Sequence, residues 1–149
     1  DKTSLNYYYF DDILPMMRIS TKSDYGLQAL MALAKKDPEA FISLKKLSKE
    51  YKLPYRFLTQ IMHTLKKADI VESREGISGG YRLARKPETI SMGEVLSLFE
   101  NDLGIMRCTT ENAFCPQAEV CPSRPAWHRI QDTITQSLLK MNLNDLLRA

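Results

Sequence analysis

Apolar residues recur every three or four positions through the first half of the chain. Over about residues 21–36 they form one helical face, consisting of Leu27, Leu30, Met31 and Ala34. The pair Asp37-Pro38 ends this predicted helix, because the residue before a proline is pushed out of the helical region. Ser43 is then placed to cap a second, shorter helix that carries Leu44, Leu47 and Tyr51.

A third amphipathic stretch, at about residues 54–68, carries the first functional signal. Pro54 takes a plausible first helical position. The inner stripe is apolar and consists of Leu58, Ile61, Leu65 and Ala68. The outer stripe is polar, rich in hydrogen-bond donors, and consists of Arg56, Thr59, Gln60, His63 and Lys67. Two short helices joined by a brief turn, the second rich in donors, predict a helix-turn-helix.

A short β-hairpin is expected directly after this helix pair. Residues 70–74 and 81–84 read as two strands around the glycine-rich tip Glu75-Gly76-Ile77-Ser78-Gly79-Gly80. A hairpin in this place is the wing of a winged helix. The predicted fold class is therefore mostly α with a small β-hairpin wing, followed by a long C-terminal helix.

The last third of the chain predicts a dimerisation region. Ser91 and Glu94 have the spacing of a capping box at the start of a helix. A long helix opens at Ser123-Arg124-Pro125, and its apolar residues lie close to a heptad seam, at Trp127, Ile130, Ile134, Leu138 and Met141. We expect an N-terminal extension or cloning remnant at 1–16, a DNA-binding domain at 17–90, and a cofactor-binding and dimerisation region at 91–149.

Charge sharpens the DNA-binding interpretation. Residues 17–90 hold fifteen Lys and Arg against eight Asp and Glu, whereas the segments on either side are each net acidic. A basic segment between acidic ones is typical of a protein that meets a polyanion with that segment alone. A solvated basic face without a partner is the alternative, as is a winged helix that contacts protein.

Specific DNA contacts follow from the predicted recognition helix and wing. The first turns of such a helix meet base edges in the major groove, here with Tyr55, Arg56, Thr59 and Gln60. Arg56 suits guanine and Gln60 suits adenine. Arg74 at the wing base is expected to enter the minor groove, with Ser78 and Gly79 at the tip. Phosphate contacts are expected from the basic residues Lys45, Lys46, Lys49, Lys66 and Lys67.

Three cysteines lie within fourteen residues, as Cys108-x6-Cys115-x5-Cys121. An odd number of cysteines argues against a closed set of disulfides. Structural zinc favours tighter pairs with two to four intervening residues. The wider spacing favours an iron–sulfur cluster, although clusters are normally bound by four protein ligands. An iron–sulfur cluster, zinc, and redox thiols without metal all remain open at this point.

Several motifs resemble one family, the IscR/NsrR/RirA group of bacterial winged-helix transcription regulators. MRISTKSDYGLQALMALA resembles the family's first helix, and FLTQIMHTLKKADIVESREGISGGYRLAR resembles its recognition helix and wing. ISMGEVLSLFE and the closing LNDLL also fit. The resemblance runs from residue 17 to about residue 147. The three cysteines resemble those of the members that bind a cluster.

This resemblance implies a homodimer that binds a palindromic operator in double-stranded DNA. It also implies a [2Fe-2S] or [4Fe-4S] cluster on the three cysteines, which a structure can lack because such clusters are lost in air. Some members use a histidine three residues after the third cysteine as fourth ligand, but Arg124 occupies that position here. Others use an acidic residue near the start of the first helix, which matches Asp24. His128 and Glu111 are the further candidates.

The function expected from these features is transcription regulation, as a repressor whose operator affinity is set by a cluster that senses iron, nitric oxide or redox state. The alternative is a metal-free regulator that uses its cysteines as redox sensors or docks a partner enzyme. We find no Ser/His/Asp set, phosphate loop or paired carboxylates, so we expect neither an enzyme nor a small-molecule substrate. Without an apolar run of eighteen residues or a signal sequence, we expect no membrane association and a cytoplasmic location.

Overall fold

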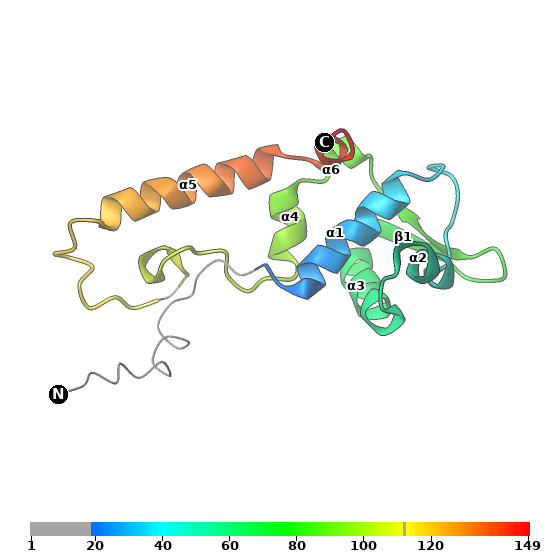
Figure 1. Cartoon of the computed structure of the whole chain (residues 1–149), viewed down its shortest axis with the longest axis horizontal. Coiled ribbons are helices and arrows are strands. Elements are labelled where there is room, and N and C mark those ends of the chain that lie inside the picture. The colour runs from blue at the N-terminus through cyan, green and yellow to red at the C-terminus, as the bar shows by residue number, and fades with distance from the viewer. Residues whose placement is uncertain (1–18, 112) are drawn as a thin grey trace, which may run out of the picture. The chain divides into compact units, whose positions relative to one another are not determined.

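The computed structural model describes residues 19–111 and 113–149, which form helices and one small hairpin (Figure 1). The predicted extension at residues 1–16 lies outside the described residues. In chain order the elements are α1 (Thr21–Ala34), α2 (Leu44–Tyr51), α3 (Tyr55–Lys67), β1 (Val71–Arg74), β2 (Gly80–Leu83), the 3-10 helix η2 (Pro87–Thr89), α4 (Met92–Ser97), the 3-10 helix η3 (Arg107–Thr109), α5 (Arg124–Lys140) and α6 (Leu143–Leu147).

The helix boundaries follow from local capping. Ser43 caps α2 as predicted, because its hydroxyl oxygen accepts a hydrogen bond from the backbone N–H of Lys46 at 3.3 Å. Ser20 caps α1 in the same way, from the N–H of Ser23 at 3.2 Å. Pro54 differs from its prediction, since it takes the extended cap position one residue before α3 rather than the first helical turn. Lys52 makes the turn between α2 and α3 in the left-handed conformation, at φ 54°.

Two compact units make up the described chain, and the first is the winged-helix unit, residues 19–101 and 135–149. Its core is made of apolar side chains from the three N-terminal helices, the hairpin and the C-terminal elements. The largest of them are fully buried, namely Leu30, Leu47, Leu58, Ile61, Met62, Leu65, Ile70, Val71, Ile90, Val95 and Leu143. The apolar stripes predicted from the sequence therefore do face one common core.

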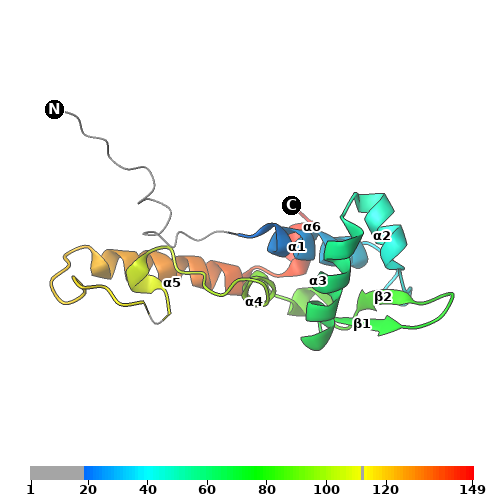
Figure 2. The ribbon, with the colours of Figure 1, turned by 90° about the horizontal axis from the view of Figure 1, so that it is seen from below.

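The hairpin lies next to α3, as Figure 2 shows, and forms the expected wing. Its strands are antiparallel, with Val71 opposite Leu83 and Arg74 opposite Gly80. The segment before α2 extends this sheet by one bridge, because Ile42 and Tyr81 exchange two backbone hydrogen bonds of 2.9 Å.

The elements after the wing complete the winged-helix unit. Both α4 and α6 pack on α1. Ser91 caps α4, with its hydroxyl accepting from the N–H of Glu94 at 3.1 Å. The predicted capping box is only half formed, because the Glu94 carboxylate pairs with Arg85 at 2.6 Å instead of returning to the backbone of Ser91. The ion pair with Arg85 thus replaces the hydrogen bond to the backbone of Ser91 that the spacing predicts for Glu94.

The second unit, the cysteine unit, comprises residues 102–134. It is held mainly by polar contacts. The Gln131 side chain accepts from the N–H of Ile105 at 2.8 Å and donates to the carbonyl of Leu103 at 3.1 Å. Asp102 accepts from the N–H groups of Gly104 and Glu111. Neither here nor elsewhere in the described ranges is there a helix long and apolar enough to cross a membrane.

Candidate nucleic-acid interface and thiol set

The exposed face of α3 is the first candidate site. Leu58, Ile61 and Leu65 anchor the inner side of the helix in the core with no exposed surface. This anchoring turns the predicted outer stripe, Arg56, Thr59, Gln60 and His63, to the surface, where all four residues are exposed. The Thr59 hydroxyl donates to the carbonyl of Tyr55 at 3.1 Å, which leaves its oxygen to accept from a ligand. The helix thus presents a row of donors and acceptors on a rigid base.

Two aromatic residues flank this row. Tyr55, which the sequence indicated, is 49% exposed. Phe57, which it did not, is 44% exposed and contacts the ring of Tyr25 edge to face, with the ring centroids 5.8 Å apart. Phe57 does not belong to the inner apolar stripe of α3. An apolar residue outside that stripe is the feature of the sequence that could have predicted an exposed aromatic side chain here. Together with Arg56 and Gln60 it lines a shallow hollow of about 240 Å³.

The lysines predicted to meet phosphates lie on α2 and in the last turn of α3. All five, Lys45, Lys46, Lys49, Lys66 and Lys67, are exposed. Lys66 also donates to the hydroxyl of Ser73 at 2.6 Å, which ties α3 to the wing. None of the five takes part in an ion pair between described residues. Their charge is therefore open to a polyanion.

The wing holds Arg74 in a defined pose. Its guanidinium carbon lies 4.3 Å from the centre of the Phe41 ring, and its Nη2 donates to the carbonyl of Ser78 at 3.1 Å. Gly79 allows the tip to close, because a Cβ there would lie 2.2 Å from the carbonyl oxygen of Arg74. The structure thus brings together Arg74, Ser78 and Gly79, the three wing residues predicted to contact DNA.

The three cysteines are free and half-buried in the cysteine unit. The Sγ of Cys121 lies 3.4 Å from the hydroxyl of Ser123. This hydrogen bond, with help from backbone N–H groups and the charge of Arg124, holds the pKa of the Cys121 thiol below its ordinary value. A lowered thiol pKa favours the thiolate, which is the form that binds metals and reacts with oxidants.

The donor set fits an iron–sulfur cluster chemically, since thiolates are the usual ligands of such clusters. Within residues 19–111 and 113–149, however, no group of three or more His, Cys, Asp and Glu side chains lies close enough to hold a metal ion. Asp24 is exposed and accepts a hydrogen bond from Gln28 at 2.8 Å. The side chain of Glu111 is exposed. The Nε2 atom of His128 is buried and has no hydrogen-bond partner among the described residues.

One polar cluster was missed by the sequence interpretation. Among the described residues Ser23 is the only buried polar or charged one, and its hydroxyl donates to the carboxylate of Glu100. The same carboxylate oxygen accepts from the backbone N–H and the hydroxyl of Ser20, at 2.7 and 2.8 Å. The contact fixes the start of α1 to the segment after α4. No local pattern signals it, because the partners are far apart in the sequence.

Known proteins support the winged-helix interpretation. A family model described as "Rrf2: Iron-dependent Transcriptional regulator" matches residues 19–149. The chain is 31% identical to the protein rrf2 of Nitratidesulfovibrio vulgaris over 132 residues, covering 89% of this chain and 88% of that protein.

Solved structures match as well. The structure of CymR, titled the global cysteine regulator of Bacillus subtilis, is 32% identical with a TM-score of 0.74, covering 89% of this chain and 98% of CymR. An IscR structure from T. potens is 30% identical with a TM-score of 0.69, covering 88% and 86% of the two chains. These relatives are transcription regulators and not enzymes. The chain belongs to the Rrf2 family of DNA-binding winged-helix transcription regulators.

Proposed function

We propose that the chain acts in the cytoplasm as a homodimeric repressor that binds a palindromic operator and responds to an iron–sulfur cluster. The observation that carries DNA binding is the face of α3, where Arg56, Thr59 and Gln60 are exposed above a fully buried apolar stripe. A rigid helix with donors at its first turns is suited to reading base edges in the major groove. The exposed lysines then add sequence-independent affinity through phosphate contacts.

Dimerisation is supported by α5. None of its seventeen residues is buried, although the helix carries four of the five seam residues seen in the sequence. Ile130 of this seam is 44% exposed, and Met141, directly after the helix, is 42% exposed. An apolar seam of this length is typical of a helix that pairs with a second helix. A second copy of the chain is the partner that supplies a matching seam and a second α3 for the other half-site.

The cofactor proposal rests on three free, half-buried cysteines in one unit. Cys108, Cys115 and Cys121 would hold the cluster, with Asp24 of the second copy as the preferred fourth ligand. A bound cluster would supply a group that responds to iron supply, nitric oxide or oxidants. The chain's own part is to keep the recognition face of α3 rigid, so that a change in the arrangement of the dimer changes its fit to the operator.

DNA binding is tested by selecting duplexes from a random pool and measuring Kd by fluorescence anisotropy over a series of salt concentrations. We expect Arg56→Ala to weaken binding about 10- to 100-fold and to relax the preference at one base pair. Lys67→Ala should weaken binding to all duplexes alike. It should also reduce the slope of log Kd against log salt concentration by about one, because one phosphate contact is lost. Equal effects of both variants on every duplex would contradict base reading by α3.

The cofactor is tested by anaerobic purification, iron and sulfide analysis, visible absorption and Mössbauer spectroscopy. A brown protein with both elements supports the proposal, and Asp24→Ala should then alter the visible spectrum while DNA binding survives. An unchanged spectrum removes Asp24 as a ligand.

A metal-free thiol regulator is the second candidate. The likeness to CymR, titled the global cysteine regulator, favours it, and the lowered pKa of the Cys121 thiol suits it as well as it suits a metal ligand. A colourless anaerobic protein whose thiols titrate and whose operator affinity changes on oxidation would support this candidate.

A further inference from the structure

The ring of Phe41 contacts two arginine side chains of the wing. The guanidinium carbon of Arg74 is 4.3 Å from the centre of its ring, and that of Arg82 is 4.7 Å away. The face of an aromatic ring attracts such cations. Phe41 comes from the segment between α1 and α2, whereas the two arginines come from β1 and β2.

The backbone fixes where the Phe41 ring points. Its neighbour Ile42 exchanges two hydrogen bonds with Tyr81 and is buried in the core. Successive side chains of an extended segment point to opposite sides, so Phe41 faces away from the core. The approach of this segment to β2 requires Gly80, which has φ +148° and where a Cβ would lie 2.3 Å from the carbonyl oxygen of Ile42.

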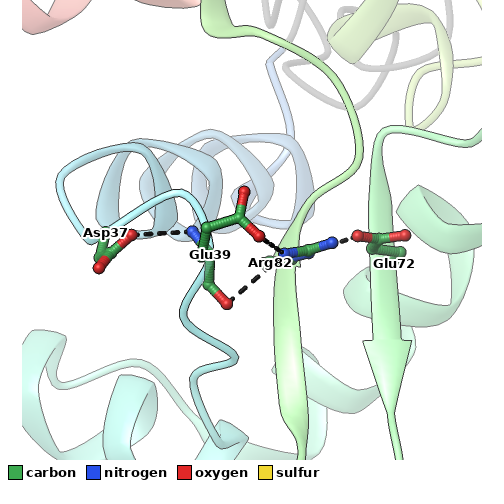
Figure 3. Close-up of polar contacts among 4 residues, drawn as sticks. All are labelled: Asp37, Glu39, Glu72 and Arg82. Carbon is green, nitrogen blue, oxygen red and sulfur yellow. Dashed lines mark hydrogen bonds and ion pairs between the residues drawn. The ribbon is translucent and has the colours of Figure 1, made fainter.

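The two arginines differ in their charge partners. Arg82 pairs with Glu39 at 2.9 Å and also with Glu72, the residue opposite it in the hairpin (Figure 3). Two carboxylates therefore balance its charge. Arg74 is exposed and takes part in no ion pair between described residues. Of the two cations on the ring, Arg74 is the one whose charge is available to DNA.

We propose that Phe41 is a positioning residue for DNA binding, which holds the guanidinium of Arg74 in place without touching DNA itself. The ring contacts Arg82, which is held by ion pairs with Glu39 and Glu72, and the same ring contacts the guanidinium of Arg74. A long side chain that is already ordered loses less conformational entropy when it binds. The inference rests on the proposed function, because it requires that the wing contacts DNA through Arg74.

The test is a double-mutant cycle on the full chain, with Kd measured by anisotropy on a selected duplex. Phe41→Leu keeps an apolar side chain but removes the aromatic face, and should weaken binding about three- to tenfold. Phe41→Tyr keeps the ring and should restore wild-type affinity. In an Arg74→Gln background, Phe41→Leu should cause no further loss, because the side chain it positions is gone.

A second variant avoids any question of folding. Arg74→Lys changes an exposed side chain, keeps the charge and removes the planar group that stacks on the ring. We expect it to weaken binding about as much as Phe41→Leu, and Phe41→Leu should add nothing to it. Thermal melts of every variant check that the winged helix is intact.

The outcomes separate this inference from the proposed function. If Phe41→Leu leaves Kd unchanged, or weakens binding equally with and without Arg74, the positioning role is wrong while DNA binding stands. If Arg74→Gln has no effect although Arg56→Ala does, the wing makes no such contact and the inference falls. If the wild type binds no duplex more tightly than Arg56→Ala does, the proposed function fails and this inference with it.

Discussion

In the winged-helix unit, apolar side chains from α1, α2, α3, the hairpin, α4 and α6 are buried in one core. In the cysteine unit, by contrast, Gly104 is the only buried residue among 102–111 and 113–134. Phe114 and Val120 of that unit are even 81% and 80% exposed. One part of the chain is thus assembled around apolar burial, while the other is connected by hydrogen bonds around Gln131 and Asp102.

This difference in apolar burial determines how rigid each unit is by itself. Burial of apolar surface stabilises a fold by about 25 cal/mol per Å², so the winged-helix unit supplies a rigid recognition helix from its own residues. Hydrogen bonds at a wet surface contribute much less. The geometry of the cysteine unit is therefore open to change by whatever its thiols bind, since metal binding is coupled to local folding. A rigid recognition helix in one unit and a thiol loop of changeable geometry in the other are suited to regulation.

The largest expected effect is on the core. Leu65→Ala removes a fully buried side chain and should lower the free energy of unfolding by about 2–5 kcal/mol. The matched change in the cysteine unit is Val120→Ala, where we expect a change within about 0.5 kcal/mol. Urea denaturation followed by circular dichroism measures both. Similar losses in the two variants would contradict the division between the units.

A smaller effect is expected where the wing meets the core. Gly80→Ala places a Cβ against the carbonyl of Ile42 and should cost about 2–3 kcal/mol. Gly76→Ala is the control, because Gly76 also has a positive φ, +102°, but faces open space, and should cost about 1 kcal/mol. Hydrogen exchange at the amides of Ile42 and Tyr81 should accelerate only in Gly80→Ala. Exchange that is unchanged in both variants would mean that the wing docks in another way.

Glu100 allows a test of the hydrogen bonds that hold the start of α1. Burial raises the pKa of this carboxyl, but hydrogen bonds from Ser23 and Ser20 outweigh it, and the net pKa lies below the ordinary 4.5. Its contribution to stability is therefore present above pH 4.5 and is lost as the pH falls through the folded-state pKa. Glu100→Gln should cost about 1 kcal/mol at pH 7.

Denaturation series at several pH values measure this contribution. The difference between the wild type and Glu100→Gln should shrink as the solution is acidified below pH 4.5, because protonation weakens the same contacts. The exposed Glu88, changed to Gln, is the control and should show little difference at any pH. A gap that widens in acid would have the wrong sign for this explanation.

The smallest effect on stability is expected at a thiol. Cys115→Ser should change the unfolding free energy of the metal-free protein by less than about 0.5 kcal/mol, since its half-buried side chain belongs to no apolar core. After anaerobic reconstitution, however, the same variant should retain much less iron than the wild type. Iron analysis beside denaturation separates the two roles. Unfolding of the metal-free variant would show that Cys115 is structural.

Local patterns determined the elements and the face of α3 that is exposed. Side chains at intervals of three and four, such as Leu58, Ile61 and Leu65, can only share a core if the segment is a helix. Ser43 and Ser91 act as caps because each bonds a backbone group within three residues. The glycine-rich tip similarly predicts the wing. The donor-rich face of α3 and the cysteine group could be predicted for the same reason, because both depend on the spacing of residues along the chain.

Only the tertiary structure decided which distant side chains share a partner. Ser23 and Glu100 are 77 residues apart, and Phe41 meets Arg74 and Arg82 only because the segment before α2 pairs with the wing. Glu94 had a local partner in its capping box, yet it pairs with Arg85. A sequence pattern states which side of an element is apolar. It does not state which charge or ring is brought opposite it, because that depends on the packing of whole elements.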